Sequence, residues 1–141
     1  MGNYLCLGAP TAIRMKLSLS PSLLTFLEEL VIPYLAGYSY FAKQGTPLFG
    51  ELAHGSDGIR EYLAELFHSK STKTPEEFLR LASLRKRCVN KEPCPCGSGR
   101  RLGRCHNRVV NALRTRLSRS WFRDEYLRVL KQLPMALSPS G

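Results

Sequence analysis

The chain has 141 residues, of which 43% are hydrophobic and 23% charged, and its formal net charge at pH 7 is +10. This hydrophobic content is enough for a core, which argues against wholesale disorder, and no run approaches the roughly 20 apolar residues that cross a bilayer. The N-terminus also lacks the charged region, apolar run and cleavage site of a secretory signal, so we expect a cytoplasmic protein without a transmembrane segment.

The first 45 residues are predicted to contain one helix after an irregular or briefly extended start at residues 1–19. Ser20-Pro21 is typical of a helix start, and apolar residues at helical spacing follow it. Pro33 is expected to kink or split this helix, because proline removes a backbone donor. The aromatic residues between Tyr34 and Phe41 are expected to form core or a helix-packing face, and Gln44-Gly45 to end the segment.

Two further helices are predicted in the middle of the chain, after a glycine-rich loop at residues 46–58. Ser56 or Asp57 is a candidate cap for the second helix, whose apolar stripe runs from Ile59 to Phe67. The third helix is predicted to begin at a capping box, Thr74-Pro75-Glu76-Glu77, and to run to the basic residues 85–87.

The remaining apolar periodicity predicts a fourth helix from Val109 and a fifth from Trp121 to Leu133. The predicted fold is therefore mainly α: a small helical domain with an irregular knuckle between helices three and four, which holds three cysteines and a histidine and is expected to bind zinc. We divide it into a helical domain at residues 1–87, a metal-binding motif at 88–108, basic C-terminal helices at 109–133 and a flexible tail at 134–141.

The cysteines indicate a metal site. Five are present, an odd number in a chain without an export signal, which argues against a disulfide framework. Cys94, Cys96 and Cys105 lie within twelve residues and are followed by His106. Three thiolates and one imidazole match the four ligands of tetrahedral structural zinc, although such a set can also take iron.

The segment between these ligands suits the same site. The Cys-x-Cys spacing requires a tight turn, which Gly97 and Gly99 permit, and three arginines would offset the negative charge of the thiolates. Cys88 is either a spare ligand or a small apolar residue at the end of helix three.

Residues 94–106 resemble the SEC-C motif, the metal-binding segment at the C-terminus of the translocation ATPase SecA, which also occurs in small bacterial proteins. The resemblance implies that Cys94, Cys96, Cys105 and His106 are the zinc ligands. Leu102 stands where the family usually has an aromatic residue and Asn107 where glycine is common, and we expect both to affect partner contacts. Four protein ligands close a zinc site, so catalysis at the metal is not expected.

Cys6 raises a different hypothesis. Its Leu-Cys-Leu context is weakly similar to bacterial ubiquitin-conjugating-enzyme-like proteins, in which a comparable cysteine forms a thioester. That resemblance would make Cys6 a vestigial nucleophile in a truncated or accessory member of a conjugation system. The sheet and upstream segment that would activate the cysteine are missing, so we expect no enzymatic activity from this chain.

The charge is concentrated in the half that holds the motif. Residues 1–68 have a net charge of −2 and residues 69–141 a net charge of +12. This asymmetry favours a non-enzymatic adaptor whose partner is an acidic protein surface or the ribosome, as the SecA tail contacts the chaperone SecB and ribosomes. Nucleic-acid binding through the arginine-rich C-terminal half is the alternative. His54 and His68 are interpreted as capping or surface residues.

Overall fold

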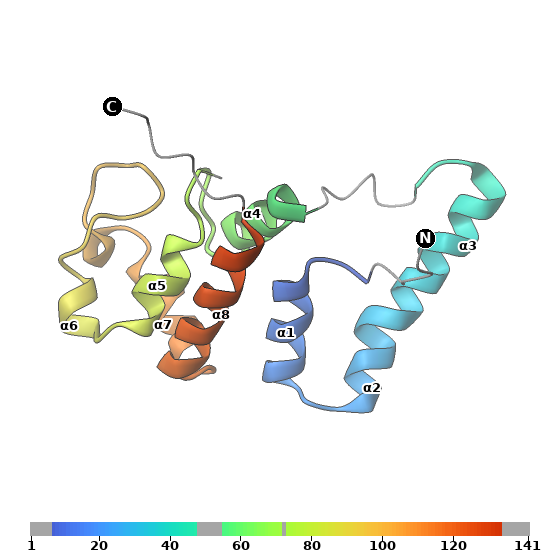
Figure 1. Ribbon diagram of the computed structural model, residues 1–141, viewed down its shortest axis with the longest axis horizontal. Coiled ribbons are helices and arrows are strands. Elements are labelled where there is room, and N and C mark those ends of the chain that lie inside the picture. Colours follow the sequence, from blue (N-terminus) through green and yellow to red (C-terminus); the bar gives the residue numbers. More distant parts are fainter. Residues whose placement is uncertain (1–6, 48–54, 72, 134–141) are drawn as a thin grey trace. The chain divides into compact units, whose positions relative to one another are not determined.

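A computed structural model describes residues 7–47, 55–71 and 73–133, and this part of the chain is mainly α-helical (Figure 1). Its only β pairing among those residues is one isolated bridge between Pro93 and Arg101. The predicted fold class is therefore confirmed. None of the described helices is long and apolar enough to cross a membrane.

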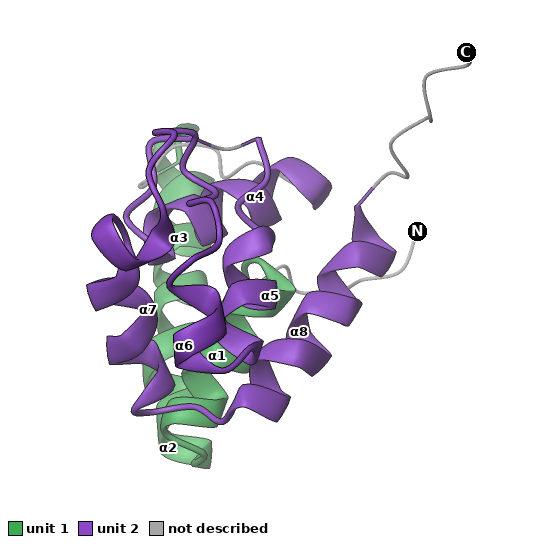
Figure 2. Ribbon diagram, turned by 90° about the vertical axis from the view of Figure 1, so that its left-hand side faces the viewer, with its two compact units in different colours: residues 1–54 green, residues 55–141 purple. Residues whose placement is uncertain are grey.

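The chain divides into two compact units, residues 1–54 (unit 1) and residues 55–141 (unit 2), which Figure 2 colours separately. The sequence-based boundaries at residues 87 and 108 stay a prediction. Cys6, His54 and the predicted tail at 134–141 lie outside the described residues.

Unit 1 begins with a helix where irregular structure was predicted. Helix α1, Pro10–Leu19, has proline in its first turn and follows Ala9, whose backbone is extended. Proline is well suited to this position, because the first N–H groups of a helix have no intrahelical partner. Thr11 and Met15, four residues apart, are the buried residues of α1. Pro10 therefore begins a helix inside the region that was predicted to be irregular or briefly extended.

A second helical segment contains a π-helical turn that ends two residues before Pro33. Helix α2, Leu23–Phe26, is capped by Ser22, whose side chain accepts a hydrogen bond from the Thr25 N–H. The π turn η1, Leu27–Val31, leads into α3, Ile32–Gln44, which ends at Gly45 with a left-handed φ of 71°. Pro33 therefore interrupts the α-helical pattern without ending the helix.

Lys16 compensates for the donor that Pro33 lacks. In a regular helix the N–H of residue 33 would bond the carbonyl of residue 29, and proline has no N–H to give. Lys16 Nζ donates to the Glu29 carbonyl at 3.4 Å and lies 3.7 Å from a Glu29 carboxylate oxygen. This contact ties α1 to the π turn within unit 1.

The apolar residues of α2 and α3 are mostly exposed, contrary to the expected packing face. Helix α3 has no buried residue, and Ile32 and Tyr38 keep 56% and 61% of their surface exposed. The helical periodicity was predicted correctly, but burial depends on neighbours that periodicity does not identify.

Unit 2 has a core of apolar and aromatic side chains from four helices. These are α4, Gly55–Leu66; α5, Glu77–Ser83; α7, Asn107–Arg114; and α8, Arg119–Gln132. The rings of Phe67 and Phe78 stack with centroids 4.8 Å apart, and Phe122 is fully buried. Helix α5 packs mainly against α8 and also against α7.

The predicted third helix is two helices. Helix α5 ends at Ser83, Leu84 is extended with φ −84° and ψ 166°, and a short helix α6, Lys86–Val89, follows. The Leu84 carbonyl accepts a hydrogen bond at 2.5 Å from Nη2 of Arg114 on α7. This bond gives the carbonyl a partner at the point where α5 ends. Helix α5 also starts at Glu77, after the predicted cap Thr74, and Glu76 makes no side-chain capping bond.

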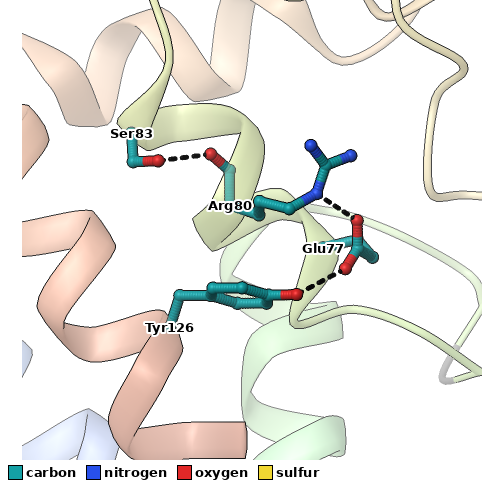
Figure 3. A network of polar contacts seen from close by, with 4 residues as sticks. All are labelled: Glu77, Arg80, Ser83 and Tyr126. Carbon is teal, nitrogen blue, oxygen red and sulfur yellow. Dashed lines mark hydrogen bonds and ion pairs between the residues drawn. The ribbon is translucent and has the colours of Figure 1, made fainter.

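A polar network fastens α5 to α8 (Figure 3). The Tyr126 hydroxyl donates to Glu77 Oε1 at 2.9 Å, and Arg80 Nε donates to Glu77 Oε2 at 2.6 Å. One carboxylate therefore accepts from its own helix and from the neighbouring one. Ser83, at the other end of α5, donates to the Arg80 carbonyl at 2.6 Å.

Candidate metal centre

The candidate metal ligands lie in a looped segment between α6 and α7, residues 91–106, which we name the knuckle. The backbone of Cys94 donates to the Arg100 carbonyl at 2.9 Å, and that of Leu102 donates to the Glu92 carbonyl at 2.8 Å. Between these bonds the chain turns through Gly97 and Gly99, whose φ angles are 75° and 72°. These left-handed angles suit glycine, as the sequence predicted.

A short 3₁₀ helix, η2, Leu102–Arg104, closes the knuckle. Leu102 is fully buried, so this residue packs in the core and does not face a partner, contrary to our expectation. Asn107 begins α7, and its side chain accepts a hydrogen bond from the Asn111 amide at 2.7 Å. At Gly103 an added Cβ would lie 2.9 Å from the Asn90 carbonyl oxygen, so glycine permits this close approach.

The knuckle gathers the four predicted ligands. One ligand atom from each of Cys94, Cys96, Cys105 and His106 lies within 4.8 Å of all the others. His106 Nδ1 is 3.1 Å from the sulfurs of both Cys94 and Cys105. The sulfurs of Cys96 and Cys105 are 3.5 Å apart, too far for a disulfide.

These separations fit a tetrahedral metal ion. With Zn–S bonds of about 2.3 Å and a Zn–N bond of about 2.0 Å, neighbouring ligand atoms of a tetrahedron are about 3.5–3.8 Å apart. The largest separation here, 4.8 Å, exceeds this by only about 1 Å. Small side-chain rotations would therefore bring all four atoms to bonding distance, and the thiolate and imidazole donors are those that zinc prefers.

The second nitrogen of His106 makes a contact that the sequence did not predict. Nε2 lies 3.1 Å from the carbonyl oxygen of His68, and because a carbonyl only accepts, Nε2 carries the proton. In the neutral ring with this tautomer Nδ1 carries no proton and can bind a metal, an arrangement typical of metal-binding histidines. The His106 ring also meets Phe78 edge-on, with centroids 5.4 Å apart.

His68 therefore contacts the candidate ligand His106 through its backbone carbonyl and not through its imidazole. It follows α4 and has a φ of 54°, which is uncommon for a residue other than glycine. Its amide donates to the Glu65 carbonyl at 3.0 Å. The His68 residue is exposed, in agreement with its interpretation as a capping or surface residue. The orientation of its carbonyl toward the knuckle, 38 residues away in sequence, had no sequence signal.

The thiols differ in how readily they ionise. Burial raises the pKa of Cys94 to about 12. Burial also disfavours the thiolate of Cys96, but hydrogen bonds from the side chain and backbone of Ser98, followed by those from Cys94 and Cys105, lower its pKa to about 6. Cys96 is therefore the thiolate that is available first to a cation near neutral pH.

The fourth described cysteine is not part of this group. Cys88 is exposed on α6, the second part of the predicted third helix, and is not among the clustered ligands, so it is not a spare ligand. Cys6, the candidate nucleophile, and His54 lie outside the described residues.

The outside of the knuckle is basic. Four of its cationic side chains are exposed: Lys91, Arg100, Arg101 and Arg104. Glu92, its acidic residue, is half-buried. The knuckle therefore presents positive charge to solvent around the clustered thiols, as the charge distribution in the sequence predicted.

Comparison with known proteins finds a match at this place. The family model described as SEC-C motif matches residues 91–108. Curated proteins and solved structures give no match. Residues 91–108 therefore form a SEC-C motif whose three cysteines and one histidine make a group suited to a metal ion, as the sequence resemblance implied.

Proposed function

We propose that the protein is a non-enzymatic adaptor in which a structural zinc ion fixes the knuckle and its basic surface for docking on an acidic protein or the ribosome. Cys94, Cys96, Cys105 and His106 would hold the ion. The ion would supply a rigid cross-link and no reaction.

The observation that carries the proposal is the convergence of four ligand atoms within 4.8 Å. Structural zinc takes four protein ligands, whereas catalytic zinc keeps one position for water or substrate. A complete Cys3His set leaves no such position. The hydrogen bond between His106 and His68 further supports a structural role, because it links the knuckle to α4.

The exposed charge supports the choice of partner. Arg100 and Arg101 follow the glycine turn and Arg104 lies in the 3₁₀ helix, and the metal would hold both segments in place. Basic surfaces of this kind steer and orient acidic partners, and arginine forms bidentate bonds with carboxylates and phosphates.

The test combines metal analysis with binding. We expect the purified protein to contain about one zinc ion per chain, Cys94→Ser to lose it, and the control Cys88→Ser to keep it. Sedimentation with purified ribosomes and titration with an acidic peptide would then compare the three proteins. Binding that is equal in Cys94→Ser and wild type would contradict the role of the metal in docking.

A separate pair of variants tests the charge. Arg100→Gln and Arg104→Gln change exposed side chains of the knuckle and should keep zinc while weakening binding. If neither change affects binding, the docking surface lies elsewhere on the chain.

Direct binding to nucleic acid is the second candidate, favoured by exposed arginines on and near α7 and α8, namely Arg108, Arg116, Arg119, Arg123 and Arg128. Affinity for RNA should then fall steeply with salt, because each neutralised phosphate releases counterions. Filter binding at two salt concentrations measures this, and no retention at low salt would exclude it.

A further inference from the structure

A second group of cationic and hydroxyl-bearing residues lies in unit 2, where the end of α5 meets the start of α8. They are Ser83, Arg119, Ser120 and Arg123, and they line a hollow of about 260 Å³. We name it the arginine pocket. The two helices run in opposite directions here, because Tyr126, further along α8, contacts Glu77 at the start of α5. None of the lining residues belongs to the candidate metal group.

The cations of the arginine pocket are only weakly neutralised by the protein. The Nε atom of Arg123 lies 3.6 Å from Asp124, but both side chains are more than half exposed, so solvent screens the pair. Arg119 is exposed as well. Burial, followed by the nearby positive charge of Arg119, lowers the pKa of Arg114 at the end of α7.

The start of α8 adds one hydrogen-bond donor to this charge. Ser118 accepts a bond from the Trp121 N–H at 3.1 Å, and its hydroxyl oxygen is 2.9 Å from that of Ser120. When Ser118 donates to Ser120, the hydroxyl hydrogen of Ser120 is left for a ligand.

We propose that the arginine pocket binds a phosphate group. The lining carries two arginines and two serines, and arginine forms bidentate hydrogen bonds with phosphate, so several acceptor oxygens of a tetrahedral anion can find donors here. The hollow is several times the roughly 30 Å³ that one water occupies in the liquid, so it also has room for part of the group that carries the phosphate. This proposal goes beyond the proposed function and does not require the metal.

The experiment titrates the full-length protein with inorganic phosphate at constant ionic strength, with chloride as the balancing anion. NMR signals of the arginine side-chain Nε–H groups report which residues respond. We expect saturable shifts at Arg119 and Arg123. Arg119→Gln and Arg123→Gln should each weaken binding at least tenfold.

Lys131→Gln is the matched control, since it removes the same charge from an exposed residue at the other end of α8. It should change the affinity by less than twofold. Equal losses in all three variants would show general charge attraction and overturn the proposal, as would the lack of saturation in the wild type. The far-UV circular dichroism spectrum, measured in parallel, shows whether each variant is folded. Zinc content, also measured in parallel, shows whether the metal site is intact, so that failure of phosphate binding can be told from failure of metal binding.

A second arm identifies the source of the phosphate. Two oligonucleotides of the same sequence, one with a 5′-phosphate and one with a 5′-hydroxyl, would be compared with inorganic phosphate. Tighter binding of the phosphorylated oligonucleotide supports a terminal monoester as the ligand. Equal binding of both, weakened by Arg119→Gln, supports the phosphodiester backbone, and oligonucleotide binding that Arg119→Gln leaves unchanged would contradict a backbone ligand in this pocket.

Discussion

The two ring nitrogens of His106 have different partners, and this division is the most informative detail at the scale of single residues. Nδ1 faces the cysteine sulfurs, and Nε2 donates to the His68 carbonyl. A hydrogen bond from the distal nitrogen fixes both the orientation of the ring and the tautomer that binds metal. The acceptor is a backbone atom, so the identity of the His68 side chain should matter little for the metal.

His68→Gly should therefore keep zinc bound. It should also raise the free energy of unfolding by about 0.5–1 kcal/mol, because glycine adopts a φ of 54° without steric cost. Metal analysis and chemical denaturation measure the two effects. His68→Ala is the control and should keep zinc without the gain in stability. Loss of zinc in His68→Gly would show that the imidazole of His68 contributes.

Zinc uptake at pH 7.5 should release protons. Cys94, whose pKa is raised to about 12, is protonated at that pH and must lose its proton to bind the metal. Cys96, whose pKa is lowered to about 6, is already ionised at pH 7.5 and takes up a proton as the pH falls through about 6, so zinc affinity should decrease there. Calorimetry in two buffers of different ionisation enthalpy measures the protons released. An observed enthalpy that is the same in both buffers would contradict the prediction.

At the scale of elements, the knuckle depends on a close approach of two backbone segments. The Gly103 N–H bonds the Asn90 carbonyl at 3.2 Å, and a side chain at Gly103 would collide with that carbonyl. Gly103→Ala should therefore lower the free energy of unfolding by about 1–3 kcal/mol, the usual cost of overpacking. Thermal denaturation of the zinc-loaded protein measures it.

Gly37→Ala is the matched control for this change. Gly37 lies inside α3, and an added Cβ there meets nothing within 4 Å. The substitution should be stabilising by about 0.5–1 kcal/mol, because alanine is the better helix former. A similar effect of both substitutions would contradict the steric explanation.

The hydrogen bond between Tyr126 on α8 and Glu77 on α5 leads to a separate prediction. Burial, followed by the hydrogen bond to Glu77, raises the pKa of Tyr126, so its hydroxyl keeps its proton at neutral pH and its stabilising contribution is lost only as the pH rises above about 10. Tyr126→Phe should lower the free energy of unfolding at pH 7 by about 1 kcal/mol. Tyr38→Phe, at an exposed tyrosine of α3, should have no measurable effect in the same denaturation experiment. Equal effects would argue against the Tyr126–Glu77 bond.

The sequence predicted elements well where an apolar stripe or a terminal glycine defined them, and poorly where a distant segment decided the outcome. The stripe from Ile59 to Phe67 corresponds to α4, and Gly45 ends α3 as expected. Helix α1 was missed because its proline suits a turn and a helix start equally. The break at Leu84 was missed because its partner is Arg114, thirty residues later.

The candidate site was more predictable than the fold around it. All four candidate ligands lie within thirteen consecutive residues, so ligand type and local spacing were enough to identify them. The carbonyl of His68 and the buried position of Leu102 depend on packing against other helices, and nothing in their local sequence indicates either.

For the whole molecule, the two units should differ in their response to metal removal. All four candidate ligands and the His68 carbonyl belong to unit 2. A ligand at a thousandfold its dissociation constant stabilises the folded state by about 4 kcal/mol, so chelation should destabilise unit 2 by a similar amount. Hydrogen exchange should then speed up in the knuckle and around residues 67–69, with little change in α3. Faster exchange in α3 alone would contradict this.

The contacts of His106 also bear on the order in which unit 2 assembles. The ligands enclose a loop of thirteen residues, and loops of about ten residues close within 10–100 ns, whereas the bond from His106 to His68 requires a closure across 38 residues. Closing the longer loop costs more chain entropy. The knuckle can therefore capture its ion while the helices are still forming, and the ordered imidazole then offers α4 a fixed docking point. Unit 2 should therefore refold faster when metal is present from the start of refolding than when metal is withheld until refolding is complete.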